Sequence, residues 1–155
     1  MSDLLVRLYD LPPPKSRPNG VSVRRALPPE RELILRWIAA HFGAGWQSEV
    51  ATGLSQQPPT AFIATRDQEL LGFAAYDCTA RGFFGPTGVD PAARGQGIGE
   101  ALLMETLRAM AAAGYAYAIV GDAGPIDFYV KRLNALEIPH SSPGFYKGML
   151  KPRSD

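Results

Sequence analysis

The chain has 155 residues, of which 46% are hydrophobic and 20% are charged, and its formal net charge is +1. That length suits one domain with a substantial core, and the near-zero charge gives no support for nucleic acid or an acidic membrane as a partner. A single cysteine, Cys78, excludes an internal disulfide. No apolar run approaches the roughly 20 residues that cross a bilayer and the first residues lack the basic region of a signal peptide, so we expect a cytoplasmic protein without membrane contact.

The first twenty residues differ in pattern from the rest of the chain. Leu4 to Leu11 alternates loosely between apolar and polar residues, which predicts a short strand. The stretch 12–20, PPPKSRPNG, cannot form a helix or a central strand, because proline fixes φ and removes backbone donors. We therefore interpret residues 1–20 as an accessory arm or connector and residues 21–155 as a single domain.

Strand and helix patterns alternate along the remaining chain. β-Branched and apolar runs predict strands, and apolar residues at helical spacing predict helices. In chain order we expect a strand over 21–27, helices over 28–42 and 46–55, strands over 60–65, 70–76 and 83–89, a helix over 97–113, a strand over 115–120, a helix over 126–136 and two short strands in the tail 137–150. This order predicts an α/β fold in which about four helices flank a mixed sheet.

The stretch RGQGIG at 94–99 is suited to bind an anion. It lies between the end of a strand and the start of a helix, where unpaired N–H groups and the helix dipole favour negative charge. Its glycines let a ligand approach the backbone, and Arg94 adds a cation. Two phosphate motifs are excluded: G-x-G-x-x-G fails in both registers, and no Gly-Lys-Ser/Thr exists for a P-loop. A phosphate site and a plain tight turn both remain open.

A longer stretch around these glycines resembles a known family. Val89, Pro91, Arg94, Gly97 and Gly99 resemble the acetyl-CoA loop of the GNAT superfamily of N-acetyltransferases, whose core is [Q/R]-x-x-G-x-[G/A]. With the strand before the loop, the helix after it and the order of elements, the resemblance extends over roughly residues 21 to 150. It implies a mostly antiparallel sheet whose fourth and fifth strands, counted from residue 21, are parallel and splay apart.

The resemblance also implies acetyl-CoA as co-substrate, without a metal. Backbone amides of the loop would hold the pyrophosphate, and the pantetheine arm would lie beside the bulged strand 83–89, which Pro86 and Gly88 interrupt. An amide at or near Val89 would polarise the acetyl carbonyl. The residues expected at the cofactor are Thr87, Gly88, Val89, Arg94, Gly95, Gln96, Gly97, Ile98, Gly99, Glu100, Phe128 and Tyr129.

Acetyl transfer to an amine needs a group that takes a proton from the amine and one that protonates the departing thiolate. The resemblance implies Tyr129, on the helix after strand 115–120, as the general acid. Its surroundings depart from the family pattern, with Asp122, Gly124 and Pro125 before the tyrosine.

The general base is less defined, because strand 83–89 lacks the glutamate that many relatives carry. Glu137 is our candidate, since it stands where the chain should return past the acetyl site. Asp77, Asp122, His140 and a water chain are the alternatives.

Residues 43–57 and 139–146, with Phe83 and Phe84, should line the acceptor pocket. Their aromatic and neutral polar character favours a small metabolite, such as an amino sugar, over a basic peptide. We expect an N-acetyltransferase that acts on a primary amine by direct attack in a ternary complex. The alternatives are an acyl-CoA-sensing module of the same fold and a different phosphate binder. A homodimer is compatible with the sequence, which does not decide the oligomeric state.

Overall fold

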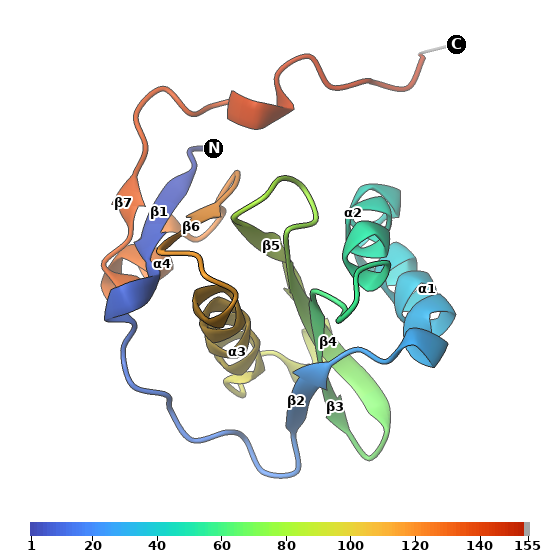
Figure 1. Ribbon diagram of the computed structural model, residues 1–155. Coiled ribbons are helices and arrows are strands. Elements are labelled where there is room, and N and C mark those ends of the chain that lie inside the picture. The colour runs from blue at the N-terminus through green and yellow to red at the C-terminus, as the bar shows by residue number, and fades with distance from the viewer. Residues whose placement is uncertain (154–155) are drawn as a thin grey trace.

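The computed structural model describes residues 1–153, which form one mixed sheet with helices on both faces (Figure 1). The strands are β1 (Leu4–Arg7), β2 (Ser22–Arg25), β3 (Ala61–Arg66), β4 (Glu69–Tyr76), β5 (Phe83–Val89), β6 (Tyr117–Val120) and β7 (Leu136–Glu137). The helices are α1 (Arg31–Phe42), α2 (Ala44–Leu54), α3 (Ile98–Ala112) and α4 (Ile126–Leu133). Short 3-10 segments are η1 (Leu8–Asp10), η2 (Pro28–Glu30), η3 (Pro91–Ala93) and η4 (Gly144–Tyr146).

The seven strands follow the order β2-β3-β4-β5-β6-β1-β7. Every neighbouring pair is antiparallel except β5 and β6. This parallel pair is joined only where Phe83 meets Ile119 and Phe84 meets Val120. The predicted fold is therefore confirmed: a mixed, mostly antiparallel sheet with four helices and one parallel pair of strands.

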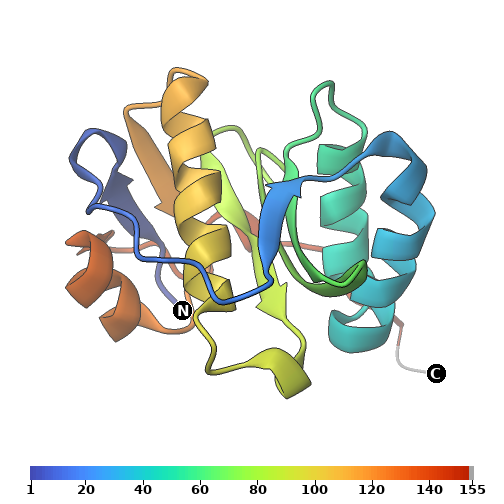
Figure 2. The same ribbon diagram turned by 90° about the horizontal axis from the view of Figure 1, so that it is seen from below.

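Each face of the sheet has its own hydrophobic core because strand side chains alternate between the two faces. On β4, Phe73 and Ala75 belong to the core beneath α1 and α2, whereas Ala74 and Tyr76 belong to the core that includes α3 and α4. Figure 2 shows α3 along one face of the sheet and the pair α1 and α2 on the other. The site described below lies where this layered arrangement opens between β5 and β6.

The helix α3 is the central element of the larger core. Its residues Ile98, Leu102 and Met110 recur at helical spacing and are at most 1% exposed. The helix begins after Gly97, whose φ of +83° is left-handed, and Gly114 follows its end with a φ of +106°. Both values favour glycine, so the sequence itself fixes where α3 starts and stops.

The first residues of the chain lie inside the sheet rather than beside it. β1 pairs with β6 on one side and with β7 on the other. Leu4 and Val6 are fully buried against the α3 and α4 core. Residues 11–21, which follow η1, run across the outer side of α3 to reach β2 (Figure 2). The segment that we expected as an accessory arm thus contributes one strand of the common sheet, followed by a connector.

Two expectations for the tail were wrong. The helix expected to reach residue 136 ends at Leu133, because Asn134 adopts a left-handed φ of +52° that terminates it. Of the two expected tail strands, only β7 forms within the described part of the tail. The second half of the tail contains η4 instead of a strand, because Pro143 and Gly144 favour a turn over an extended conformation.

None of the helices formed by residues 1–153 combines the length and the apolar character that crossing a membrane would require.

Candidate functional site

The strand β5 carries a bulge that separates it from β6. Between the paired positions Ala74–Thr87 and Tyr76–Phe84, β4 advances two residues while β5 advances three. The additional residue falls at Gly85 and Pro86, where Gly85 has a φ of +121°. A bulge bends its strand, and the pairing with β6 ends at Phe84. The second half of β5 therefore presents an edge that no described strand covers on the β6 side.

Backbone alternation identifies which amide of this edge is available. The N–H of Asp90 donates to the carbonyl of Leu71 on β4, at 2.8 Å. Successive N–H groups of a strand point in opposite directions, so the N–H of Val89 points away from β4, toward the gap. The Thr87 hydroxyl is occupied, because it donates to the carbonyl of Phe73 at 3.0 Å.

The loop that follows β5 begins with a hydrogen-bonded turn, and its next amides remain unpaired among the described residues. Asp90 accepts a hydrogen bond from the amide of Ala92 at 3.0 Å and so fixes η3. Within residues 1–153, none of the six successive amides from Gly95 to Glu100 donates a hydrogen bond. Gly95 and Gly97 adopt φ values of +80° and +83°. Six unpaired donors at the start of a helix form the kind of site that binds a phosphate group.

Arg94 lies at this loop but is turned back toward the strand. Its Nε–H donates to the carbonyl of Val89 at 3.2 Å, and the side chain is exposed. Gln96 is also exposed, and its amide oxygen accepts a hydrogen bond from Arg66 at 3.0 Å. Ile98 is the exception among the expected loop residues, because its side chain is buried in the core and only its backbone faces the loop.

Glu100 would oppose a bound phosphate if its charge were alone. Burial acts to raise the pKa of Glu100, but hydrogen bonds and charges from Arg132 and Lys15 lower it overall. Arg132 extends from α4 to bind this carboxylate, and Lys15 reaches it from the connector at 3.3 Å. One carboxylate is thus paired with two cations, which leaves the first turn of α3 locally positive.

Tyr129 lies on α4 and is 6% exposed. It belongs to the same core cluster as Phe84 and Val120, the last paired residues of β5 and β6. Burial raises the pKa of its hydroxyl, and no residue in the described chain accepts a hydrogen bond from it. Phe128 packs against the Tyr129 ring at 5.4 Å but is 41% exposed. Tyr129 therefore has a protonated hydroxyl group, and its O–H makes no hydrogen bond to the described part of the chain.

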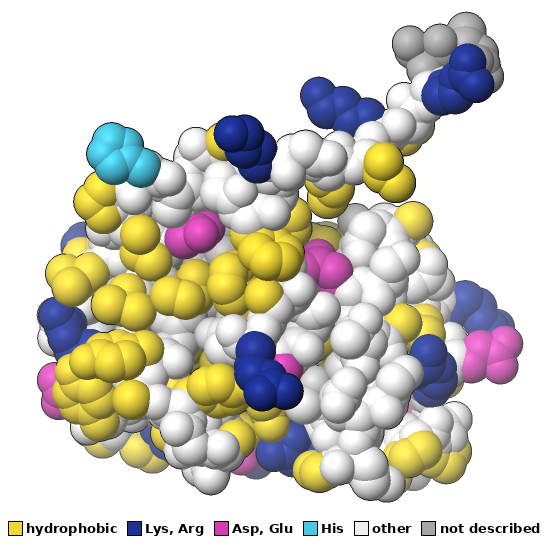
Figure 3. Space-filling model, turned by 45° about the horizontal axis from the view of Figure 1, so that its top comes forward, with side chains coloured by type: hydrophobic (Ala, Val, Ile, Leu, Met, Phe, Trp, Pro, Cys, Tyr) yellow, Lys and Arg dark blue, Asp and Glu magenta, His cyan; other side chains and the backbone are white. Residues whose placement is uncertain are grey.

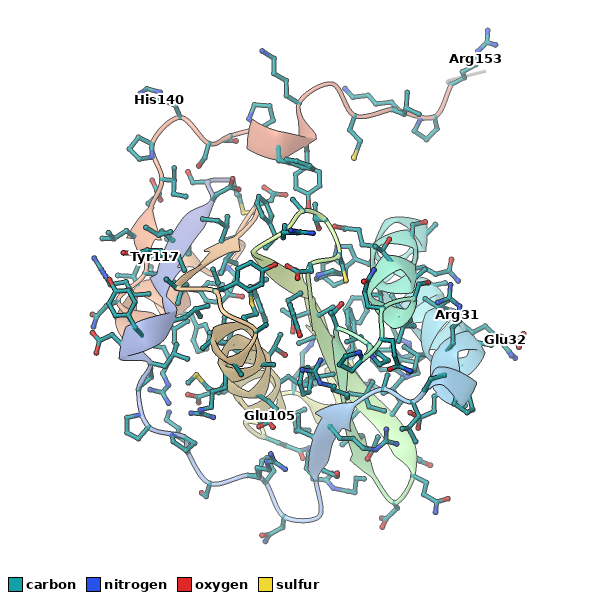
Figure 4. All side chains as sticks on the ribbon, viewed as in Figure 1. Arg31, Glu32, Glu105, Tyr117, His140 and Arg153 are labelled. Atoms are coloured by element: carbon teal, nitrogen blue, oxygen red, sulfur yellow. The ribbon has the colours of Figure 1, made fainter. Side chains whose placement is uncertain are left out.

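The expected bases are spread over the molecule. Glu137 lies exposed on β7, and the strands β6 and β1 stand between it and β5. Asp77 accepts hydrogen bonds from the Tyr115 hydroxyl at 2.8 and 2.9 Å and from the amide of Gly82 at 2.8 Å, so it fixes a turn. Asp122 is exposed, and Figure 4 shows His140 at the outer side of the tail, directed away from the sheet.

The structure brings together the three segments expected to line the acceptor pocket. Glu49 of α2 accepts hydrogen bonds from the Thr79 hydroxyl, in the loop between β4 and β5, and from the Tyr146 hydroxyl of η4 at 3.4 Å. Phe145 packs on Phe83 with ring centroids 5.7 Å apart. Figure 3 shows hydrophobic side chains with acidic ones on either side beneath the tail. A carboxylate bordered by aromatic rings can attract an ammonium group.

Glu49 and Thr79 were not predicted as site residues. Glu49 is the one carboxylate of residues 43–57, the segment assigned to the acceptor pocket, and this position could have indicated it. His41 was also missed. It stacks on Trp37 with ring centroids 4.2 Å apart, and its Nε2 lies 3.7 Å from the Asp90 carboxylate that caps η3.

The sequence matches the family model described as the acetyltransferase (GNAT) family over residues 25–134. It matches no curated protein. Among solved structures, a GCN5-related N-acetyltransferase from Sphaerobacter thermophilus is 17% identical with a TM-score of 0.69 over 88% of this chain and 48% of that one. A glucosamine N-acetyltransferase region of a fungal multi-domain β-N-acetylglucosaminidase is 15% identical with a TM-score of 0.69 over 88% of this chain and 19% of that one. A GNAT family acetyltransferase from Brucella melitensis, solved in complex with acetyl-CoA, is 21% identical with a TM-score of 0.56 over 76% and 86%.

The chain thus spans less than half of the Sphaerobacter protein and about a fifth of the fungal one. At these identities the three structures establish a shared fold.

Proposed function

The chain belongs to the GNAT family of acetyltransferases, and from this premise we propose that it transfers the acetyl group of acetyl-CoA to a primary amine of a small molecule in a ternary complex. The observation that carries the proposal is the set of six unpaired amides from Gly95 to Glu100, next to the uncovered edge of β5. An extended molecule with a diphosphate in its middle would satisfy both features. The Brucella relative was solved with acetyl-CoA, which supports the same co-substrate here.

The residues of this chain fit that co-substrate. Backbone donors suit a diphosphate because their dipoles add to that of α3, and Gly95 has open space where a Cβ would stand. Two cations at Glu100 remove the repulsion that its carboxylate would exert. The Val89 N–H is directed toward the gap, where it could stabilise negative charge on a carbonyl oxygen.

Bound acetyl-CoA supplies an activated thioester. In the transfer, the bond from the amine nitrogen to the acetyl carbon forms while the carbon–sulfur bond breaks. The Tyr129 hydroxyl is suited to protonate the departing sulfur, since its raised pKa keeps it protonated at neutral pH. The proton that the amine loses must pass to a base, which can return it to the tyrosine through solvent.

Two carboxylates are candidates for that base. Glu137, indicated by its position in the sequence, lies on β7, two strands beyond β6. Glu49 lies among Thr79, Tyr146 and the pair of Phe83 and Phe145. A base must come within hydrogen-bond reach of the proton that it removes, directly or through one water. Glu49 fits this requirement better, because it shares its surroundings with the aromatic residues that would border the acceptor.

The acceptor class follows from the same surroundings. An ammonium group would be attracted by Glu49, and flat or ring-shaped parts of a small molecule would pack on Phe83 and Phe145. An amino sugar has both parts. The fungal structure described as a glucosamine N-acetyltransferase region shares this fold, and that description supports testing amino sugars first.

The proposal is tested in two steps. Thermal unfolding with acetyl-CoA, ATP and NAD should show stabilisation by acetyl-CoA alone, by about 2.7 kcal/mol at a hundredfold excess over Kd. A panel of primary amines, beginning with glucosamine, is then assayed for release of free thiol. Binding of acetyl-CoA without turnover of any amine would favour an acyl-CoA-sensing module, which the absence of a carboxylate on β5 also suggests. Stabilisation by ATP or NAD instead of acetyl-CoA would refute the proposed function.

A further inference from the structure

The connector between η1 and β2 forms a groove against α3. We call it the arm groove: a cavity of about 260 Å³ bordered by Pro14, Lys15 and Arg17 on one side and by Gly97, Met104 and Arg108 on the other. Figure 2 shows the connector passing over the outer side of α3. Glu105 lies on the same side of the helix (Figure 4). The cavity lies between the connector and α3, and Met104 of the main core forms part of its floor.

Four contacts hold the connector over the helix. Lys15 binds Glu100 at 3.3 Å, and Arg17 binds Glu105 at 3.1 Å. Arg108 and Arg132 donate to the carbonyls of Pro12 at 3.5 Å and Pro13 at 3.4 Å. These two ion pairs and two hydrogen bonds fix the position of the connector relative to α3 and so define the width of the groove.

Cations outnumber carboxylates around the arm groove. Lys15, Arg17, Arg108 and Arg132 surround two acidic residues, Glu100 and Glu105. Within residues 1–153, no carboxylate pairs with Arg108, which lines the cavity. The chain as a whole has a formal net charge of +1, so this excess is local. A phosphate group is the ligand that such an excess favours.

The groove is continuous with the loop of free amides. Gly97 belongs to both, and Pro18 of the connector lies 3.9 Å from the place where a Cβ of Gly97 would stand. An α-helix has about 3.6 residues per turn, and the lining of the arm groove runs from Gly97 to Arg108, so the groove extends along the first three turns of α3 from the amide site. A ligand whose diphosphate occupies the amides could therefore place its next group in the groove.

We propose that the arm groove binds the 3′-phosphoadenosine end of acetyl-CoA, with the 3′-phosphate at Lys15 and Arg17 and the base against Pro14 and Met104. This inference rests on the proposed function, since it extends the same ligand from the amide site into the groove. The volume is near the lower end of small-ligand pockets, about 300 Å³, and so accommodates one end of the molecule. The connector then acts as a part of the binding site for the co-substrate.

The test compares three ligands by isothermal titration calorimetry: acetyl-CoA, its 3′-dephospho form, and S-acetyl-4′-phosphopantetheine, which lacks the nucleoside. The wild-type protein should bind acetyl-CoA about tenfold more tightly than the 3′-dephospho form. The Lys15→Ala/Arg17→Ala variant should lose this preference, because its affinity for acetyl-CoA falls about tenfold more than that for the 3′-dephospho form. Both affinities also fall by a common factor, since Lys15 helps to neutralise Glu100 beside the diphosphate. Arg36→Ala is the matched control, since Arg36 also pairs with a surface glutamate, Glu32, at 3.4 Å but lies on α1.

A second variant tests the position of the base. Ala101 lines the groove, and Ala101→Phe should fill part of it. The affinities for acetyl-CoA and its 3′-dephospho form should fall, while that for S-acetyl-4′-phosphopantetheine should not. Melting curves identify any variant that does not fold; in that case Lys15→Gln/Arg17→Gln, which retains the side-chain stems, replaces the alanine pair with the same expected loss of preference.

The outcomes separate this inference from the proposed function. If the wild-type protein binds none of the three ligands, the proposed function and this inference both fail. If it binds acetyl-CoA but the folded Lys15 and Arg17 variants retain the wild-type preference for the 3′-phosphate, the arm groove is not the nucleotide subsite and the proposed function stands.

Discussion

Among the single residues of the site, Tyr129 allows the most direct test. Its side chain is largely buried, and this burial raises the pKa of its hydroxyl. Tyr129→Phe retains the ring and its packing and removes only the hydroxyl group that would donate the proton. We expect kcat to fall by roughly 10²–10⁴-fold, the usual effect of losing a general acid, with little change in the Kd for acetyl-CoA. A Phe variant with normal kcat would leave protonation of the thiolate to water, and a variant with weakened acetyl-CoA binding would assign the hydroxyl to that ligand.

Glu49 and Glu137 form a second pair of residues to compare. Glu49→Gln removes the charge that Thr79 and Tyr146 surround, whereas Glu137→Gln changes an exposed residue on β7. We expect Glu49→Gln to lower kcat/KM by about 10²-fold or more, as loss of a general base does, and Glu137→Gln to have an effect below about threefold. Steady-state kinetics with the best amine of the panel measures both. The reverse ranking would restore Glu137 as the base.

At the scale of elements, the two ends of α3 provide a matched pair of glycines. Gly97 and Gly114 have φ values of +83° and +106°, so a side chain at either position is strained. Gly97→Val and Gly114→Val should therefore lose similar stability. Only Gly97→Val should weaken acetyl-CoA binding, by about tenfold or more, or 1.4 kcal/mol. Unchanged affinity in folded Gly97→Val would remove the loop from the site.

The strand β5 and the helix α1 pack closely at Gly88 and Phe42. A Cβ on Gly88 would lie 2.5 Å from the ring of Phe42, which is too close for the two elements to keep their separation. Gly88→Ala should destabilise the protein by about 1–3 kcal/mol, as overpacking does. The smaller side chain in Phe42→Leu should recover part of this loss when the two changes are combined. Urea unfolding of the two single variants and the double variant measures the coupling, and strictly additive effects would argue against the contact.

For the molecule as a whole, the place of β1 within the sheet makes the first residues of the chain part of the folded core. Leu4 is fully buried, whereas its neighbour Leu5 is only partly buried and belongs to neither core. Leu4→Ala should cost about 2–5 kcal/mol, and Leu5→Ala should cost clearly less. Thermal unfolding should remain a single transition in both variants. If Leu4→Ala were as stable as the wild-type protein, β1 would not be part of the cooperative unit.

The sequence predicts local features of this molecule well and distant ones poorly. Periodicity locates α3 and β4, and the Gly97 loop is apparent because its glycines and the following helix are contiguous. The partners of β1 do not follow from its four residues, since the pairing of strands depends on segments more than 100 residues away. Glu49 was missed for the same reason: only the fold brings a carboxylate of α2 to the tail residue Tyr146.

The position of β1 between β6 and β7 also has a kinetic consequence. Leu4 pairs with Val120 and Glu137, so the sheet closes contacts that are separated by almost the entire chain. Contacts of such high sequence separation slow folding, because the entropy of closing a long loop is lost before the pairing compensates for it. During synthesis residues 4–7 are made long before residues 117–137, and until then β1 has neither of its two strand partners. We expect the completion of this half of the sheet to be the slow phase of refolding, and it is the stage at which the chain is most exposed to aggregation.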